Sequence, residues 1–209
     1  MSVFDKVSAH RVVAVLVIDR EEDAVPLAEA LLAGGVQVME LTLRTEAAMG
    51  ALRKIRAAVP EMIAGIGTIL TTDQVEEVRD ADAAFGVSPG LNERVLEKAA
   101  DIVLPFAPGI VTPSDIERAL PFDCRVLKFF PAEPSGGLKY LDAIAAPYKH
   151  FGLTYMPLGG LHLGNMGDYL ANPAVAAIGG SWIARRDLIQ GGNWTQITAN
   201  AREAVANSN

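Results

Sequence analysis

The chain has 209 residues, of which 50% are hydrophobic and 21% are charged, and its formal net charge is −7. This length and composition suit one globular domain with a single sizeable core. The acidic balance excludes the basic classes of protein that bind nucleic acid or anionic membrane surfaces, but a local pocket for a small anion remains compatible with it.

Cys124 is the only cysteine, so no disulfide can form within the chain, and a reducing, cytoplasmic location is favoured. We interpret Cys124 as a small buried or half-buried hydrophobic residue. The apolar run at 12–18 is too short for a signal peptide and follows charged residues. No apolar run approaches the roughly 20 residues of a membrane-spanning helix, so we expect no membrane partner.

Short runs rich in Val and Ile alternate along the chain with amphipathic segments rich in Ala, Leu and Glu. This alternation predicts repeated β-then-α units, and the opening residues 2–9 are compatible with an extra short helix. The predicted strands span 11–19, 36–43, 62–68, 83–89, 102–108, 125–131, 154–159 and 175–181. The predicted helices span 21–34, 46–58, 72–81, 92–100, 113–120, 137–147, 164–171 and 194–206.

Residues typical of helix ends support these boundaries. Gly34 and Gly35 follow the first long helical segment, where glycine commonly ends a helix. Thr45, the pair 71–72 and Thr112 each stand where a helix is expected to begin. A threonine hydroxyl at such a position can accept a hydrogen bond from a free backbone N–H, so we expect these residues to cap their helices.

The predicted strands are apolar on both faces, which is typical of a parallel sheet covered by helices. Eight β/α units favour one closed (β/α)8 TIM barrel with short loops, formed by a single domain over 1–209. The alternative is an open doubly wound sheet. That fold would need a glycine-rich phosphate fingerprint early in the chain, and the end of the first strand, 17–20, has no glycine.

In a barrel the chemistry belongs at the carboxyl ends of the strands, so the polar residues there are candidate site residues. Glu40, Thr42 and Arg44 alternate along the second strand, and alternate side chains share a face. If this face points inward, a carboxylate and a guanidinium project into the mouth of the barrel. A structural ion pair between Glu40 and Arg44 is the alternative interpretation.

Other strand ends carry a hydroxyl or paired glycines. Thr68 ends the third strand, and the last two strands end at the pairs 159–160 and 179–180. Taken separately, a threonine at a strand end is an ordinary cap, and a glycine pair is an ordinary tight turn. Taken together, the glycine pairs match the place where barrels bind phosphate with backbone N–H groups and a helix N-terminus.

Lys128 is the one lysine of six that falls within a predicted strand, between Leu127 and Phe129. A buried lysine is costly unless it is paired or neutral. A structural salt bridge to Glu40 would explain it. The functional interpretation is a nucleophile, because a dry pocket favours the neutral amine, which can attack a carbonyl and form a Schiff base.

The chemistry of these residues together indicates which groups the substrate carries. A lysine nucleophile suits a ketone, and Arg44 with Thr68 can hold a carboxylate. Glu40 can move protons directly or through water. The glycine turns, with the hydroxyl of Ser181, can hold a phosphate. The expected substrate is therefore a 2-keto acid with a phosphate at its far end.

The sequence resembles the 2-keto-3-deoxy-6-phosphogluconate aldolase family, also described as 4-hydroxy-2-oxoglutarate aldolases. The resemblance runs from about Val12 to Ala204. It implies a class I, Schiff-base lyase on a short (β/α)8 barrel, without a cofactor, usually trimeric and active in carbohydrate metabolism through the Entner–Doudoroff pathway. For the gluconate substrate the products are pyruvate and glyceraldehyde 3-phosphate. The motifs that carry the resemblance are AGGVQVMELTLRT, GIGTIL, SPGLNE, PGIVTPSD, LKFFPAE and IGGSW.

The resemblance also implies roles for individual residues. Lys128 would be the Schiff-base lysine and Glu40 the general acid and base, while Arg44 and Thr68 would bind the pyruvyl carboxylate. Other residues would line the pocket or hold the phosphate. The pocket walls would be Pro89 and Phe130, and the phosphate would lie against Gly159, Gly160, Gly180 and Ser181.

Two positions depart from the family pattern. The family commonly has Pro-Thr-Gly-Gly at the seventh strand, where this chain has Leu158 as a pocket residue. A leucine cannot bond a substrate hydroxyl, so the preferred length and stereochemistry of the substrate are open. Close behind stands His162, which we interpret as a surface-loop histidine, with a helix cap or an anion contact as alternatives.

Several alternatives stay open at this stage. The same site could prefer unphosphorylated 4-hydroxy-2-oxoglutarate or decarboxylate oxaloacetate. A phosphosugar epimerase would use acid/base pairs or a metal and would not need a strand lysine beside an arginine for a carboxylate. A non-catalytic phosphometabolite-binding barrel would show no covalent chemistry. We expect no metal, because His10, His150 and His162 show no ligand spacing.

Overall fold

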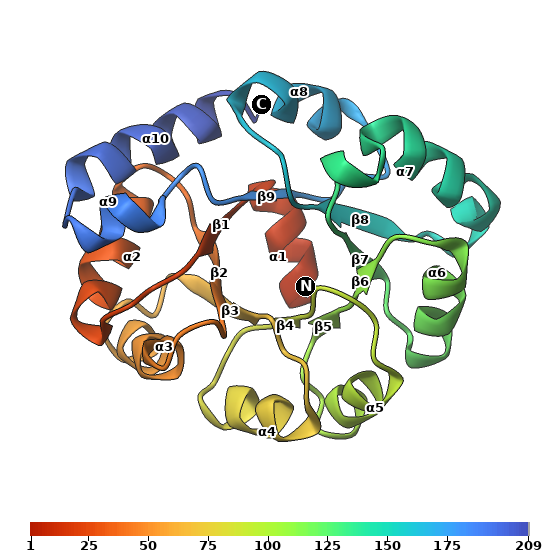
Figure 1. Ribbon diagram of the computed structural model, residues 1–209, viewed down its shortest axis with the longest axis horizontal. Coiled ribbons are helices and arrows are strands. Elements are labelled where there is room, and N and C mark those ends of the chain that lie inside the picture. Colours follow the sequence, from red (N-terminus) through yellow and green to blue (C-terminus); the bar gives the residue numbers. More distant parts are fainter. Residues whose placement is uncertain (209) are drawn as a thin grey trace.

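The structure is a computed structural model that describes residues 1–208. Parallel strands lie around the centre of the molecule; helix α1 lies at that centre and the other helices lie outside the strands (Figure 1). Within the described residues the pairing forms a six-stranded sheet of order β5-β4-β3-β2-β1-β9 and a three-stranded sheet of order β6-β7-β8. The strands are β1 (Val12–Leu16), β2 (Val38–Thr42), β3 (Ile63–Gly67), β4 (Gly86–Val87), β5 (Phe106–Ala107), β6 (Gly109–Ile110), β7 (Val126–Phe129), β8 (Thr154–Pro157) and β9 (Ile178–Gly180).

The two sheets meet at two places. Phe106 to Ile110 runs through β5 and β6, which pair with β4 and β7 respectively. Isolated parallel bridges join Tyr155 to Val175 and Leu158 to Gly179, which connects the β8 segment to the β9 segment. The result is a curled parallel α/β sheet, as the β-then-α alternation predicts.

The helices follow the predicted order, and the expected extra helix at the start of the chain is present as α1. The α-helices are α1 (Val3–His10), α2 (Ala24–Ala33), α3 (Ala47–Ala58), α4 (Thr72–Asp80), α5 (Glu93–Asp101), α6 (Pro113–Ala119), α7 (Gly137–Ala145), α8 (Leu163–Ala171), α9 (Arg186–Gln190) and α10 (Trp194–Ala206). Short 3-10 turns are η1 (Glu21–Asp23), η2 (Leu120–Phe122), η3 (Glu133–Ser135) and η4 (Ala146–Phe151).

Most predicted caps are confirmed. The Thr71 and Thr112 hydroxyls each accept from the backbone N–H three residues on, in complete capping boxes. Gly35 takes up a left-handed φ of +90° just beyond α2. The Thr45 prediction is wrong, because its hydroxyl donates to the carbonyl of Ile18 instead of capping α3.

The predicted strand at 102–108 is wrong in its first half. Ile102 ends α5, and Val103 turns the chain with a left-handed φ of 57°, so β5 begins only at Phe106. Pro108 then separates β5 from β6, because a proline has no N–H to donate to a sheet ladder. The short helix α9 was not predicted at all.

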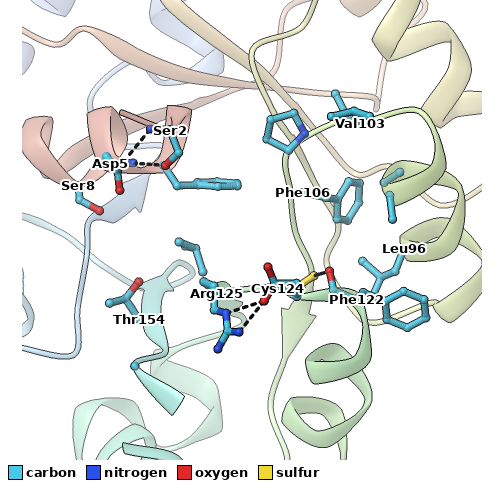
Figure 2. Close-up of a pocket in the computed structure, with 18 residues that line it drawn as sticks. Ser2, Asp5, Ser8, Leu96, Val103, Phe106, Phe122, Cys124, Arg125 and Thr154 are labelled. Atoms are coloured by element: carbon cyan, nitrogen blue, oxygen red, sulfur yellow. Dashed lines mark hydrogen bonds and ion pairs between the residues drawn. The ribbon is translucent and has the colours of Figure 1, made fainter. Parts of the chain in front are cut away.

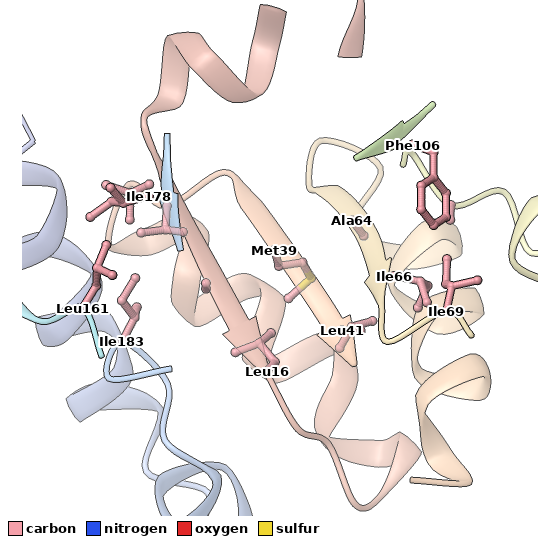
Figure 3. Close-up of a cluster of buried hydrophobic side chains, with 14 of the residues drawn as sticks. Leu16, Met39, Leu41, Ala64, Ile66, Ile69, Phe106, Leu161, Ile178 and Ile183 are labelled. Atoms are coloured by element: carbon pink, nitrogen blue, oxygen red, sulfur yellow. The ribbon is translucent and has the colours of Figure 1, made fainter. Parts of the chain in front are cut away.

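The core has two parts, one on each face of the strands. The outer part packs between strands and helices, and includes Leu16, Met39 and Leu41 (Figure 3). The inner part includes Val13, Val38, Phe85, Val87, Met156 and Leu158. Inner and outer residues alternate along each strand, as apolar residues on both faces require.

Helix α1 packs on the inner part of the core. Val7 is buried there, and the rings of Phe4 and Phe85 lie 5.8 Å apart at a tilted angle. Ser2 and Asp5 form the capping box that begins the helix. Because α1 leads directly into β1, it covers the amino ends of the strands and leaves the carboxyl ends open for a site. Among residues 1–208, no helix has both the length and the apolar character needed to cross a membrane.

Candidate active site

Lys128 and Glu40 form an ion pair inside the molecule. Lys128 lies on β7 and Glu40 on β2, and Lys128 Nζ donates to Glu40 Oε1 at 2.8 Å. The two side chains are 6% and 0% exposed, so neither charge is solvated by bulk water. The ammonium also lies 5.4 Å from the centroid of the Phe130 ring, within the range of a cation–π contact.

Gly67 makes room for this pair. A Cβ placed on Gly67 would lie 1.9 Å from Glu40 Oε1, so any other residue here would push the carboxylate out of its observed place. Gly67 pairs with Thr42 in the β2–β3 register, two residues beyond Glu40. The sequence analysis gives Gly67 no role, although its position as the last residue of β3 could have indicated a close contact at the strand end.

The second carboxylate oxygen of Glu40 has no partner. Among the described residues nothing bonds Glu40 Oε2, although the atom is buried. Buried polar atoms are normally bonded, and a purely structural ion pair would satisfy both oxygens. Glu40 therefore has an acceptor left over, which a hydroxyl or a water molecule could use.

Arg44 does not pair with Glu40. Arg44 lies beyond the end of β2, is exposed, and donates from Nε to Thr42 Oγ1 at 3.1 Å. Thr42 in turn donates to the carbonyl of Leu16 at 2.8 Å, which fixes it at the strand end. No Arg44–Glu40 ion pair occurs within residues 1–208, so that alternative for Glu40 is wrong.

Thr68 directly follows β3 in an unusual backbone conformation. It is half-buried and has a φ of 65°. A β-branched residue in the left-handed region of backbone dihedral space is strained, and strained residues of this kind are concentrated at active sites and ligand-binding sites. The strained backbone at the end of β3 agrees with the ligand-binding role that the sequence predicts for Thr68, and that role stays a prediction.

Pro89 and Phe130 lie against glycines on the two sides of the Lys128 strand, and Phe130 itself directly follows that strand. Gly109 is the register partner of Lys128, and a Cβ on Gly109 would lie 2.1 Å from the Pro89 carbonyl oxygen. On the other side, a Cβ on Gly159 would lie 3.2 Å from the Phe130 ring. Both Pro89 and Phe130 are half-buried, so they lie between the core and the open end.

The two glycine pairs stand at neighbouring strand ends, but the predicted turn at 179–180 is wrong, because Gly179 and Gly180 are the last two residues of β9. Gly159 and Gly160 have left-handed φ values of +94° and +85°, which favour glycine. Gly180 is buried under the Trp182 ring, and Ser181 is exposed beside it. The Leu158–Gly179 bridge links the two strand ends.

Comparison with known proteins identifies the family. The family model for KDPG and KHG aldolase, where KDPG is 2-keto-3-deoxy-6-phosphogluconate and KHG is 4-hydroxy-2-oxoglutarate, matches residues 3–200. The chain belongs to the KDPG and KHG aldolase family. The resemblance that the six motifs carry is thereby confirmed.

Named relatives of this aldolase family cover nearly the whole chain. The 2-dehydro-3-deoxy-phosphogluconate aldolase of Dickeya dadantii is 47% identical over 95% of this chain and 92% of its own. The KHG/KDPG aldolase of Escherichia coli K12 is 46% identical over 93% of this chain and 90% of its own.

A solved aldolase structure has the same fold. It is the KDPG aldolase of Legionella pneumophila, with pyruvate captured at low pH as a covalent carbinolamine intermediate. It superimposes with a TM-score of 0.90 at 38% identity, over 96% of this chain and 95% of that one.

Leu158 is buried in this member of the aldolase family. It is 3% exposed and packs on Gly179, where a Cβ would lie 2.7 Å from the leucine Cγ. The side chain offers no hydrogen bond. Only the backbone of Leu158 bonds: its N–H donates to the Phe129 carbonyl at 3.0 Å, and its carbonyl accepts from the Ala132 N–H at 2.7 Å.

His162 is a helix cap. It is exposed, as the surface-loop interpretation expects, but its Nδ1 accepts from the Gly164 N–H at 3.0 Å. Asn165 completes a capping box by accepting from the His162 N–H at 2.8 Å. The cap, which the sequence left as an alternative, is thus the observed role.

A cavity of about 670 Å³ lies at the opposite end of the molecule (Figure 2). It is bounded by α1 and by residues at the amino ends of strands, including Phe106 and Thr154. Cys124 lines it, and burial raises the pKa of this thiol to about 11, which makes it a poor nucleophile. None of the predicted site residues lines this cavity.

Proposed function

We propose that this protein is a class I aldolase that cleaves a 2-keto-3-deoxy-6-phospho-sugar acid to pyruvate and glyceraldehyde 3-phosphate. The observation that carries the proposal is the buried Lys128–Glu40 contact of 2.8 Å, in a chain of the KDPG and KHG aldolase family. The covalent pyruvate adduct of the Legionella relative supports amine chemistry on a ketone.

The first step prepares the nucleophile. Glu40 accepts a proton from the Lys128 ammonium across their hydrogen bond, which leaves a neutral amine. The amine attacks the C2 ketone and gives a carbinolamine. Glu40 returns this proton to the carbinolamine hydroxyl, which leaves as water, so Glu40 is again a carboxylate and a protonated imine that can accept an electron pair remains.

The second step breaks the carbon–carbon bond. Glu40, directly or through a water on its unpartnered Oε2, removes the proton of the C4 hydroxyl. The C3–C4 electron pair moves into the imine, so the aldehyde leaves and a pyruvate enamine remains on Lys128. Protonation at C3 and hydrolysis release pyruvate and restore the amine.

The remaining site residues hold the substrate. Arg44 and Thr68 bind the carboxylate at the ends of β2 and β3, supported by their position and by the charge of the guanidinium. Pro89, Phe130 and Leu158 wall the pocket. The phosphate lies against backbone N–H groups and one hydroxyl, from Gly159, Gly160, Gly180 and Ser181.

A shorter, unphosphorylated 4-hydroxy-2-oxoglutarate is the second candidate substrate. Leu158 supports it, because an apolar wall removes one means of selecting a longer polyhydroxy substrate. Oxaloacetate decarboxylation through the same imine is a related activity.

The steady-state kcat/KM for KDPG and for KHG, with both products quantified, tests the function. We expect equal amounts of pyruvate and aldehyde, and a higher kcat/KM for KDPG. A higher value for KHG would favour the second candidate. Absence of pyruvate from either substrate would contradict the aldolase proposal and favour an epimerase or a binding protein.

We further infer that the two sheets form one closed eight-stranded barrel within a single domain. The pairing of β4 with β5, of β6 with β7, and the bridges between the β8 and β9 segments support this closure. From the family resemblance we also propose that the protein is a homotrimer. We expect it to act in the cytoplasm and without a cofactor.

A further inference from the structure

Glu133 joins the Schiff-base strand to the Gly159–Gly160 turn. It begins η3, just after β7, and its backbone N–H donates to the Gly159 carbonyl at 3.0 Å. The neighbouring Ala132 N–H donates to the Leu158 carbonyl at 2.7 Å. Two backbone hydrogen bonds therefore tie this segment to the turn to which we assign the phosphate.

The side chain of Glu133 lies directly against that turn. A Cβ on Gly160 would lie 2.6 Å from Glu133 Cβ and 2.8 Å from Glu133 Cγ. The nearest atoms to Gly160 are thus the hydrocarbon stem and backbone of Glu133, while the carboxylate lies further off. A rotation of this stem could nevertheless bring the negative charge towards the exposed Gly160.

Tyr169 holds the carboxylate in its observed place. The Tyr169 hydroxyl, on α8, donates to Glu133 Oε1 at 2.5 Å, and the tyrosine is 2% exposed. A Cβ on Gly137, at the start of α7, would lie 3.2 Å from the same Oε1 and 3.4 Å from the tyrosine oxygen. Burial, together with the hydrogen bond to Glu133, raises the pKa of Tyr169, so the phenol stays a donor.

We propose that Tyr169 is a positioning residue for anion binding, because its hydroxyl keeps the Glu133 carboxylate away from the Gly159–Gly160 turn. A free carboxylate beside the turn would repel a phosphate, whereas a carboxylate bonded to Tyr169 leaves the backbone N–H groups of the turn to the anion. This inference rests on the proposed function, which assigns the phosphate to that turn.

The test compares three variants with wild type on phosphorylated KDPG and on unphosphorylated KHG. Tyr169→Phe releases the carboxylate, and we expect the KM for KDPG to rise roughly fivefold, as a partly screened charge at close range would cause. The kcat for KDPG and the kcat/KM for KHG should stay unchanged. Glu133→Gln keeps an acceptor without the charge, so the double variant should regain most of the lost KDPG affinity.

A fourth variant covers the case in which Tyr169→Phe folds poorly. Glu133→Asp keeps the charge on an exposed residue but shortens the reach to Tyr169, so it should raise the same KM. An unchanged KM for KDPG in both Tyr169→Phe and Glu133→Asp would overturn the positioning role. A rise that Glu133→Gln fails to reverse in the double variant would also overturn it, because that result indicates a purely structural effect.

Binding of inorganic phosphate, measured by titration calorimetry, separates this inference from the proposed function because it requires no catalysis. Weaker phosphate binding in Tyr169→Phe, in a protein that cleaves no 2-keto acid, would overturn the proposed function alone. Equal phosphate binding in wild type and Tyr169→Phe, in a protein that cleaves KDPG, would overturn the positioning role alone.

Discussion

Two ion pairs in this chain have similar geometry and opposite surroundings. Lys128–Glu40 joins β7 to β2 at 2.8 Å, with side chains 6% and 0% exposed. Arg186–Asp19 joins α9 to the loop after β1, with Nε 2.8 Å from Oδ2 and side chains 55% and 24% exposed. Distance alone does not distinguish the two pairs.

Bonding capacity does distinguish them. Asp19 accepts from both Arg186 and Gln190, and the hydrogen bond from Arg186 lowers the pKa of Asp19 to about 2. Glu40 keeps one buried oxygen without a partner among residues 1–208. The comparison teaches that the buried pair keeps bonding capacity that a substrate could use, whereas the bonded, largely exposed pair only connects α9 to the loop after β1.

The largest difference should appear in turnover. Glu40→Gln removes the proton acceptor, and we expect kcat for KDPG to fall by roughly 10²–10⁴-fold, the usual range for general acid–base catalysis. Asp19→Asn, the matched change in the exposed pair, should leave kcat unaltered. Steady-state kinetics on both variants measures this, and normal turnover in Glu40→Gln would remove Glu40 from its proposed role.

The next difference concerns stability. Lys128→Met leaves the Glu40 charge buried and unpaired, which should lower the free energy of unfolding by about 3–5 kcal/mol. Arg186→Ala breaks an exposed, solvent-screened pair and should lower the free energy of unfolding far less than Lys128→Met does. Urea unfolding measures both, with Lys128→Met/Glu40→Gln as the control that restores neutrality. Equal losses in the two single variants would contradict the distinction drawn between the pairs.

The smallest effect is a pH dependence confined to the exposed pair. The pKa of Asp19 falls from 3.8 to about 2 on folding, so its contribution is complete above about pH 4 and is lost as the pH falls through 2. Arg186→Ala should therefore be less stable than wild type above pH 4, and the gap in the free energy of unfolding should shrink as the pH falls through 2 and close below it. Because the pair is largely exposed, the gap should be small. A gap that stays constant as the pH falls below 2 would show that the loss has another cause.

Local features of the structure could be predicted from the sequence because their partners lie close in the chain. The Thr71 and Thr112 capping boxes close over three residues, and the apolar neighbours of Lys128 already indicate a strand. Lys128 and Glu40 lie 88 residues apart, yet both fell within expected strands, so the fold pattern linked them.

The failures involve partners that no spacing indicates. Thr45 looks like a cap but bonds Ile18, 27 residues earlier. Glu133 and Tyr169 meet across 36 residues and three secondary-structure elements, and nothing in either local sequence announces the contact. Such contacts depend on how loops pack at the ends of the strands, and short-range periodicity carries no information about that packing.

Reductive trapping tests the central claim most directly. Incubation with pyruvate and borohydride should add one reduced pyruvate to the chain, and peptide mapping should place it on Lys128. Lys128→Met should form no adduct, whereas Glu40→Gln should still form it slowly. An adduct on any other lysine, or none on the wild-type protein, would contradict the Schiff-base account.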